Sequence, residues 1–291
     1  MNLKNMLNKI LYPEGGNKMR AFVYILGASK SPNKIECPVP FEIDEKEIFF
    51  GPCKKGLRQK LKKEVDMNGK LDSETFFVGL NASNAIKERK KERKIVWAGK
   101  IQTHYTFQQA NAKLVSSKYL PIKSGEKTDN FPLHVIPFKN GYQLKNDLHS
   151  ENDDWILDLV SNNESVMHDK NSKSITLKKG SSFNRDICFI FSNIFFANRF
   201  GSGIEIKNEI LDIFKISQPD KKNIDSFAVF GYRKDHSIDG KTGLWLELDN
   251  QLTQRLIKLI EKQAEKIKKY PTSSQTKTNN KRNKNYQGGC K

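Results

Sequence analysis

A glycine-containing turn followed by basic residues is the first stretch of this sequence that could carry chemistry. Residues 51–58 read Gly-Pro-Cys-Lys-Lys-Gly-Leu-Arg, and apolar residues then recur at four-residue spacing, which predicts an amphipathic helix over residues 54–65. Free backbone N–H groups at a helix start, beside cationic side chains, can bind phosphate. A solvated basic helix face is the alternative. The candidate nucleic-acid-binding residues of this stretch are Gly51, Cys53, Lys54, Lys55 and Arg58.

Two further apolar stretches, residues 76–81 and 94–101, predict neighbouring strands. Glycine within a strand permits close approach of a ligand, an aromatic ring offers a stacking face for a base, and an amide can read a base edge. Trp97 could equally be a core residue and Asn81 a turn residue. Pairing of the two strands would bring together Gly79, Asn81, Trp97, Gly99 and Lys100.

A third candidate stretch, residues 192–201, combines aromatic residues, two amides and an arginine. Interleaved aromatic and basic residues suit base stacking together with phosphate contact. The alternative is a buried strand end with one exposed arginine. The candidate residues here are Phe195, Asn198 and Arg199.

The charge balance favours a polyanionic partner. Lys and Arg number 51 against 33 Asp and Glu, which gives a formal net charge of +18. A lysine-rich and asparagine-rich composition accounts for part of the lysine count but not for the deficit of acids. No apolar run of about 18 residues occurs, and residues 1–12 are too short and polar for a signal sequence, so we expect no membrane association and a cytoplasmic location.

Cofactor and catalytic signatures are missing from the sequence. The four cysteines are widely spaced, which predicts neither a zinc site nor a redox pair. Phosphate-binding-loop, serine-hydrolase, zinc-protease and zinc-deaminase motifs do not occur. We therefore expect no metal, no cofactor and no assigned catalytic residue. Cys53 at a helix start, His236 and the pair Asp153–Asp154 are the residues on which an enzymatic alternative would depend.

The predicted elements indicate one α+β domain over residues 19–270, after an N-terminal arm (1–18) and before a disordered basic tail (271–291). Strands are expected at 21–26, 75–80, 94–101, 187–191 and 227–232, and helices at 106–114, 206–214 and 250–269. A loop-rich insertion covers about 116–180, with a possible strand at 134–138 and a helical turn at 155–160. The order predicts a mixed, mostly antiparallel sheet that curls into a β-barrel with peripheral helices.

Residues 22–114 resemble the nucleotide-modification-associated domains of the PUA-like group, which includes the EVE domains. The resemblance lies in Phe-Val-Tyr-Ile-Leu at 22–26, Phe-Phe-Gly-Pro-Cys-Lys at 49–54, the strand ending in Gly79, residues 93–101 and Thr106-Phe107. Residues 192–201 are similar to a later family stretch. The resemblance implies a PUA-like barrel that holds a base, which can be a modified one, in a DNA-modification or anti-phage defence setting.

The sequence thus predicts a module that binds nucleic acid or a nucleotide through a basic surface and an aromatic-lined base pocket. Two alternatives stay open. One is an enzyme that modifies nucleotides or DNA bases, or a nuclease. The other is an interaction subunit of a defence complex, with protein partners encoded in the same operon.

Overall fold

The computed structural model of the chain describes residues 18–26, 40–51, 54–80, 94–114, 120–121, 135–138, 141–144, 186–200, 203–217 and 245–269. Its strands are β1 (Met19–Ile25), β2 (Phe41–Glu42), β3 (Glu47–Phe50), β4 (Glu74–Leu80), β5 (Lys94–Thr106), β6 (Leu120–Pro121), β7 (Val135–Phe138), β8 (Gly141–Leu144), β9 (Ile187–Phe196), β10 (Ile204–Glu205) and β11 (Trp245–Leu248). Its helices are α2 (Lys55–Asn68), α3 (Phe107–Leu114), α6 (Ala197–Phe200), α7 (Glu209–Ile216) and α8 (Asn250–Lys269).

The main sheet is mixed and mostly antiparallel, as predicted. Its strands follow the order β11-β1-β4-β5-β9-β3-β2-β6, and β10 pairs with β5 outside this path. Only β1 and β4 run parallel among these paired strands. The first and last described strands are neighbours, with Ala21 opposite Leu248. Because β11 and β6 end the path, the pairing among the described strands leaves the sheet open, and the predicted closed barrel is not formed by it.

Most of the expected elements are present. The strands at 21–26, 75–80 and 94–101 correspond to β1, β4 and β5, and the helices at 54–65, 106–114, 206–214 and 250–269 to α2, α3, α7 and α8. The strand at 187–191 continues to residue 196 as β9, with a register shift opposite Ala98/Gly99. The expected strand at 227–232, the turn at 155–160, residues 1–17 of the arm and the tail lie outside the described residues.

Local sequence signals explain where the helices begin. Thr106 Oγ1 accepts a hydrogen bond from the Gln109 backbone N–H at 3.2 Å, and Gln109 Oε1 accepts one from the Thr106 N–H at 2.8 Å. This reciprocal capping starts α3. Asp249 Oδ1 accepts the Leu252 N–H at 2.8 Å and so caps α8.

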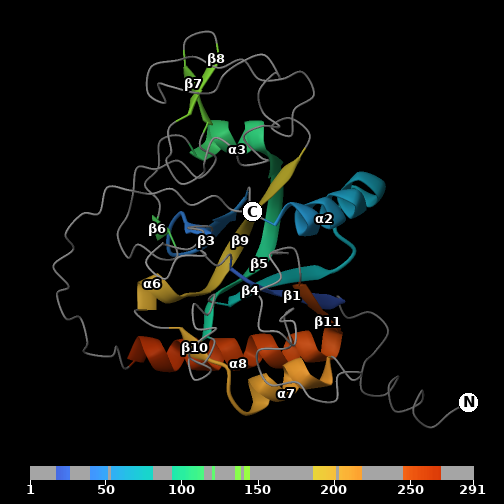
Figure 1. Cartoon of the computed structure of the whole chain (residues 1–291), viewed down its shortest axis with the longest axis vertical. Helices are drawn as coiled ribbons and strands as arrows, with labels where there is room; N and C mark the ends of the chain where they lie inside the picture. Colours follow the sequence, from blue (N-terminus) through green and yellow to red (C-terminus); the bar gives the residue numbers. More distant parts are fainter. Residues whose placement is uncertain are drawn as a thin grey trace, which may run out of the picture.

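Helices cover both faces of the sheet, with α2 on one side and α7 and α8 on the other (Figure 1). Side chains alternate along β1, so that Phe22 and Tyr24 enter one core while Ala21 and Val23 enter the other. We call the core under α2 and α3 the aromatic core, because rings dominate it, and the core under α7 and α8 the aliphatic core. A strand buried on both faces needs a continuous apolar run, which explains the sequence of β1.

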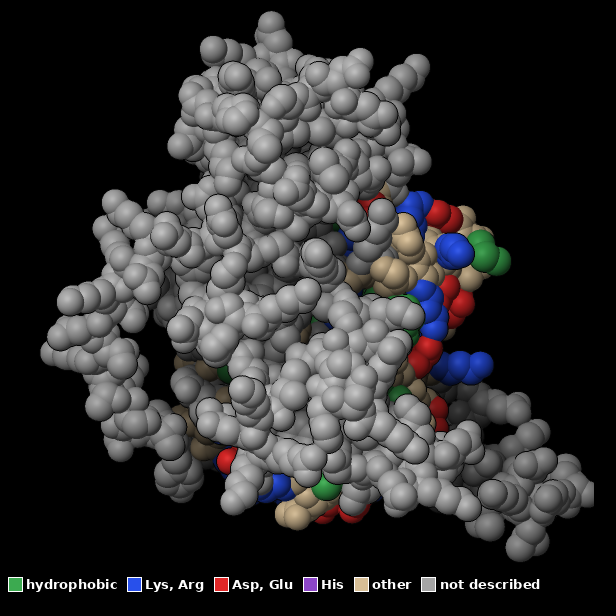
Figure 2. Space-filling view, viewed as in Figure 1, with side chains coloured by type: hydrophobic (Ala, Val, Ile, Leu, Met, Phe, Trp, Pro, Cys, Tyr) green, Lys and Arg blue, Asp and Glu red, His purple; other side chains and the backbone are tan. Residues whose placement is uncertain are grey.

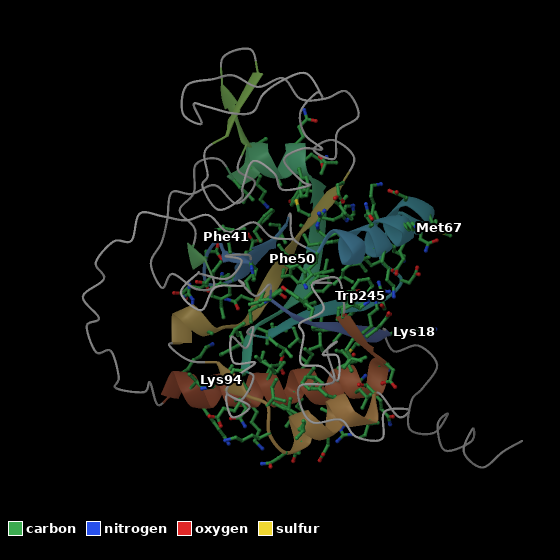
Figure 3. The ribbon with its side chains drawn as sticks, in the orientation of Figure 1. Lys18, Phe41, Phe50, Met67, Lys94 and Trp245 are labelled. Atoms are coloured by element: carbon green, nitrogen blue, oxygen red, sulfur yellow. The ribbon has the colours of Figure 1, made fainter. Side chains whose placement is uncertain are left out.

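The sheet is strongly curled around the aromatic core. Tyr24 on β1 and Phe50 on β3 lie with ring centroids 5.8 Å apart, although three strands separate β1 from β3 in the sheet order. Phe50 also contacts Phe77 edge-on at 5.1 Å. Figure 3 places Phe50 at the centre of the molecule, among the side chains of this core. The concave face of the sheet is therefore filled by aromatic side chains.

Candidate nucleic-acid interface

The turn before α2 leads directly into the helix, as the sequence predicts. Lys54 adopts the left-handed conformation (φ 56°, ψ 49°) immediately before α2, and its ammonium lies 5.1 Å from the centre of the Tyr24 ring. Gly51 is buried, and a Cβ added there would lie 2.8 Å from Cys188 Cβ. Close packing against β9 therefore explains why a glycine occupies this position, and no bound ligand is needed to explain it. Cys53 and the Lys55 side chain lie outside the described residues.

Arg58 was expected to contact phosphate, and its position in the structure contradicts that role. Its side chain is 0% exposed and lies 2.6 Å from the Asp186 carboxylate. It also donates to the Ile187 carbonyl at 2.7 Å and lies 5.0 Å from the centre of the Phe107 ring. Removing a guanidinium from water requires such partners, and all of them are internal. Arg58 thus joins α2 to the start of β9 instead of facing an external anion.

Two other cations of α2 are paired with nearby carboxylates. Lys60 forms a salt bridge with Glu247 on β11, and Lys62 forms one with Asp66 one turn later. Arg20 on β1 donates to Glu64 at 2.8 Å. Figure 2 accordingly shows Lys, Arg, Asp and Glu side chains interspersed over α2. Paired charges of both signs produce a weaker field than an unpaired cationic row.

The two central strands pair as predicted, with Gly79 opposite Trp97, but they do not present a base-stacking face. Trp97 is 0% exposed, and its indole N–H donates to the Tyr24 hydroxyl at 3.0 Å. A Cβ on Gly79 would lie 2.0 Å from the indole nitrogen. Gly79 is therefore required by the neighbouring tryptophan, and the stacking role expected of Trp97 is wrong because both of its ring faces are buried.

Gly99 and Lys100 on β5 also have structural partners. A Cβ on Gly99 would lie 2.8 Å from Phe191 Cβ and from the Ser192 carbonyl oxygen, so the position is closed by β9. The Lys100 ammonium lies 3.0 Å from the Glu74 carboxylate on β4. Asn81 lies outside the described residues.

The third candidate stretch lies at the end of β9 and in α6, and its arginine forms an ionic cluster with Glu42 and Glu45. Phe195 is fully buried in the aliphatic core, so it offers no face to a base, and the Asn198 side chain lies outside the described residues. Arg199 donates to both oxygens of Glu42, at 2.7 and 3.1 Å. Its hydrogen bond with Glu42, and then that with Glu45, raises the pKa of the guanidinium. Arg199 therefore ties α6 to strand β2, where Glu42 is 1% exposed.

A row of cations on α8 is the feature that the sequence interpretation did not identify. The residues recur three or four positions apart and so share one face of the helix. All are exposed, and no salt bridge joins any of them to another described residue. We call this row the α8 stripe; it consists of Arg255, Lys258, Lys262 and Lys266. The spacing of these cations can be seen in the sequence. What sets the row apart is that cations elsewhere, such as Lys60 and Lys62, are paired with carboxylates.

The described residues supply little for catalysis. Burial raises the pKa of the Cys188 thiol well above its ordinary value, so this cysteine stays protonated. Within the described ranges, no group of three or more His, Cys, Asp or Glu side chains is arranged to hold a metal ion. The residues of the enzymatic alternative, Cys53, His236 and the pair at 153–154, lie outside those ranges.

Comparisons of the chain with protein-family models, with curated proteins and with solved structures found no match. The interpretation of the site therefore depends on its own geometry. Among the helices that the structure describes, none is long and apolar enough to cross a membrane.

Proposed function

We propose that this chain binds nucleic acid, and that the α8 stripe is a principal part of its contact surface. The observation that carries the proposal is the difference in pairing. Lys60 and Lys62 on α2 form salt bridges, whereas the four cations of the stripe are exposed without a described carboxylate partner. Unpaired cations on a rigid support attract phosphates strongly, because binding releases the counterions condensed on the nucleic acid.

The overall charge supports the same class of partner. With a formal net charge of +18, the chain carries a long-range field that attracts polyanions. The helix macrodipole explains cations in the last turn of α8, where they lie near partially negative carbonyl groups. It does not explain Arg255 and Lys258, which lie in the first half of the helix.

Base recognition inside a PUA-like barrel is the finer form of this proposal. What supports it is the curl of the sheet, which brings β1 and β3 face to face across the aromatic core. Trp97 and Phe195 do not contact a base in this proposal, because both side chains are fully buried. A base pocket would therefore have to use other residues.

The test compares two variants that each remove four positive charges. The first replaces the α8 stripe: Arg255→Gln, Lys258→Gln, Lys262→Gln and Lys266→Gln. The matched control replaces four salt-bridged cations, two of them on α2: Lys60→Gln, Lys62→Gln, Lys94→Gln and Lys207→Gln. Glutamine has a helix propensity close to that of lysine, so both helices should persist.

Fluorescence anisotropy with labelled oligonucleotides measures the affinity at several salt concentrations. We expect the stripe variant to lose at least about tenfold in affinity near 0.1 M salt, and the control to lose much less, because its cations are already paired with carboxylates. Equal losses in both variants would mean that net charge alone drives binding and would reject the stripe. Failure of the unmodified protein to bind any oligonucleotide would reject the function itself.

A further inference from the structure

The α8 stripe is long enough to contact several phosphates of a duplex strand. Successive stripe cations are separated by three, four and four residues, so at about 1.5 Å per residue the row extends over roughly 16 Å. Phosphates on one strand of a duplex advance by about 3.4 Å along its axis but also wind around it, so neighbouring phosphates lie roughly 7 Å apart and this length spans about two to three of them. The stripe is thus as long as a short segment of duplex backbone.

The stripe is also held rigidly. Leu256 and Ile260 on the opposite face of α8 are fully buried in the aliphatic core, and Leu252 and Ile257 are nearly so. The start of the helix is fixed by the Asp249 cap and by the Asn250 side chain, which accepts the Met19 backbone N–H at 2.8 Å. Figure 1 shows α8 running beneath the sheet, where it contacts β1, β9, β10 and β11. Its cations therefore present a fixed row, and binding requires little ordering of the protein.

Residues 250–269 contain no aromatic side chain. Proteins that hold single strands usually combine a basic groove with aromatic rings, because stacking of each base offsets the cost of ordering a flexible chain. A duplex is already ordered and presents its phosphates at fixed spacing. Lys and Arg side chains that reach phosphates position a protein on a duplex but carry no direct sequence information.

From these observations we propose that the α8 stripe binds the backbone of double-stranded DNA, independently of base sequence and base modification. This inference rests on the proposed function and specifies its substrate. Two carboxylates, Glu261 and Glu265, lie at one edge of the stripe and limit its field on that side. The duplex backbone is accordingly expected to lie along the row of cations and away from that edge.

The experiment uses the full chain and the stripe variant described above, with three probes of about 20 nucleotides or base pairs. These are a duplex, a second duplex of unrelated sequence, and one of the single strands. The quantity of interest is the ratio of unmodified to variant affinity on each probe, because this ratio isolates the contribution of the stripe from that of the rest of the chain. The slope of this ratio against salt concentration gives the number of phosphates that the stripe contacts.

On both duplexes we expect the ratio to fall with salt, with a log–log slope of about −1.8 to −2.7, which corresponds to two to three contacts at about 0.9 each. We expect the ratio on the single strand to be several-fold smaller at 0.1 M salt, because a single strand has a lower charge density and must be ordered along the stripe. An equal or larger ratio on the single strand, or ratios that differ more than about tenfold between the two duplexes, would overturn the inference while leaving nucleic-acid binding in place. No binding of any probe, with retention on anionic vesicles that the stripe variant loses, would overturn both.

Discussion

Helices α2 and α8 are both amphipathic and lysine-rich, yet their cations have different surroundings. On α2, Arg58 is buried beside Asp186, and Lys60 and Lys62 are paired with carboxylates. On α8, the stripe cations are exposed, and no salt bridge to another described residue is formed. The comparison teaches that the number of cations on a helix does not identify a binding surface. What identifies it is how many of those charges the fold leaves unneutralised.

The largest expected effect is a loss of stability when the buried charge on α2 is removed. Arg58→Ala leaves the Asp186 carboxylate without its cation and should lower the free energy of unfolding by about 3–5 kcal/mol. Urea unfolding followed by circular dichroism measures it. The control is Lys63→Ala on the exposed face of the same helix, which should stay within about 0.5 kcal/mol. If Arg58→Ala lowered the free energy of unfolding by less than about 1 kcal/mol and altered the affinity for DNA, Arg58 would be a nucleic-acid contact after all.

The next largest effect separates the anchor of α8 from its binding face. Leu256→Ala removes a fully buried side chain from the aliphatic core and should cost about 2–5 kcal/mol of unfolding free energy. The affinity for duplex DNA, measured well below the unfolding transition, should stay within about twofold, because the exposed stripe is unchanged. The stripe variant should show the opposite pattern, with near-normal stability and weakened binding. If both substitutions weakened binding equally, the rigidity of α8 would matter more than its charge.

A smaller effect of opposite sign is expected within α2. Gly56 is helical and exposed, and an added Cβ would meet only the Trp245 ring at 3.7 and 3.9 Å, which is ordinary contact. Gly56→Ala should therefore raise the free energy of unfolding by about 0.5–1 kcal/mol. Thermal unfolding, read as an increase in Tm, checks this. A decrease would mean that the start of α2 needs the freedom of glycine, and would revive this turn as a functional element.

The smallest expected effect tests where the phosphates lie on α8. Replacing Glu261 and Glu265 by Gln removes the two carboxylates beside the stripe and should tighten duplex binding a few-fold at low salt. The gain should disappear near 1 M salt, where charges are screened within about 3 Å. The control is Glu64→Gln on α2, which should improve binding much less, because α2 covers the other face of the sheet from α8. No change in either variant would contradict the placement of the phosphates along the stripe.

Much of the fold was predictable because local patterns carry it. Strands buried on both faces need continuous apolar runs, as in β1 and β4, and α8 displays a complete amphipathic repeat. The caps at Thr106 and Asp249 are equally local. Strands of two to four residues, such as β2, β10 and β11, were not predicted, because their hydrogen bonds come from partners far away in the sequence.

The sequence by itself determined the charge of the molecule, the main strands and helices, and the spacing of cations along residues 250–269. Only the tertiary structure decided which of its chemically suggestive residues are available. Trp97 and Gly79 form one packing unit, Arg58 and Asp186 form a buried pair, and Phe195 lies in the aliphatic core. The physical reason is that burial and charge pairing depend on neighbours far away in the chain: Trp97 contacts Tyr24, 73 positions away, and Arg58 contacts Ile187, 129 positions away. The spacing of residues along one segment contains no information about such neighbours.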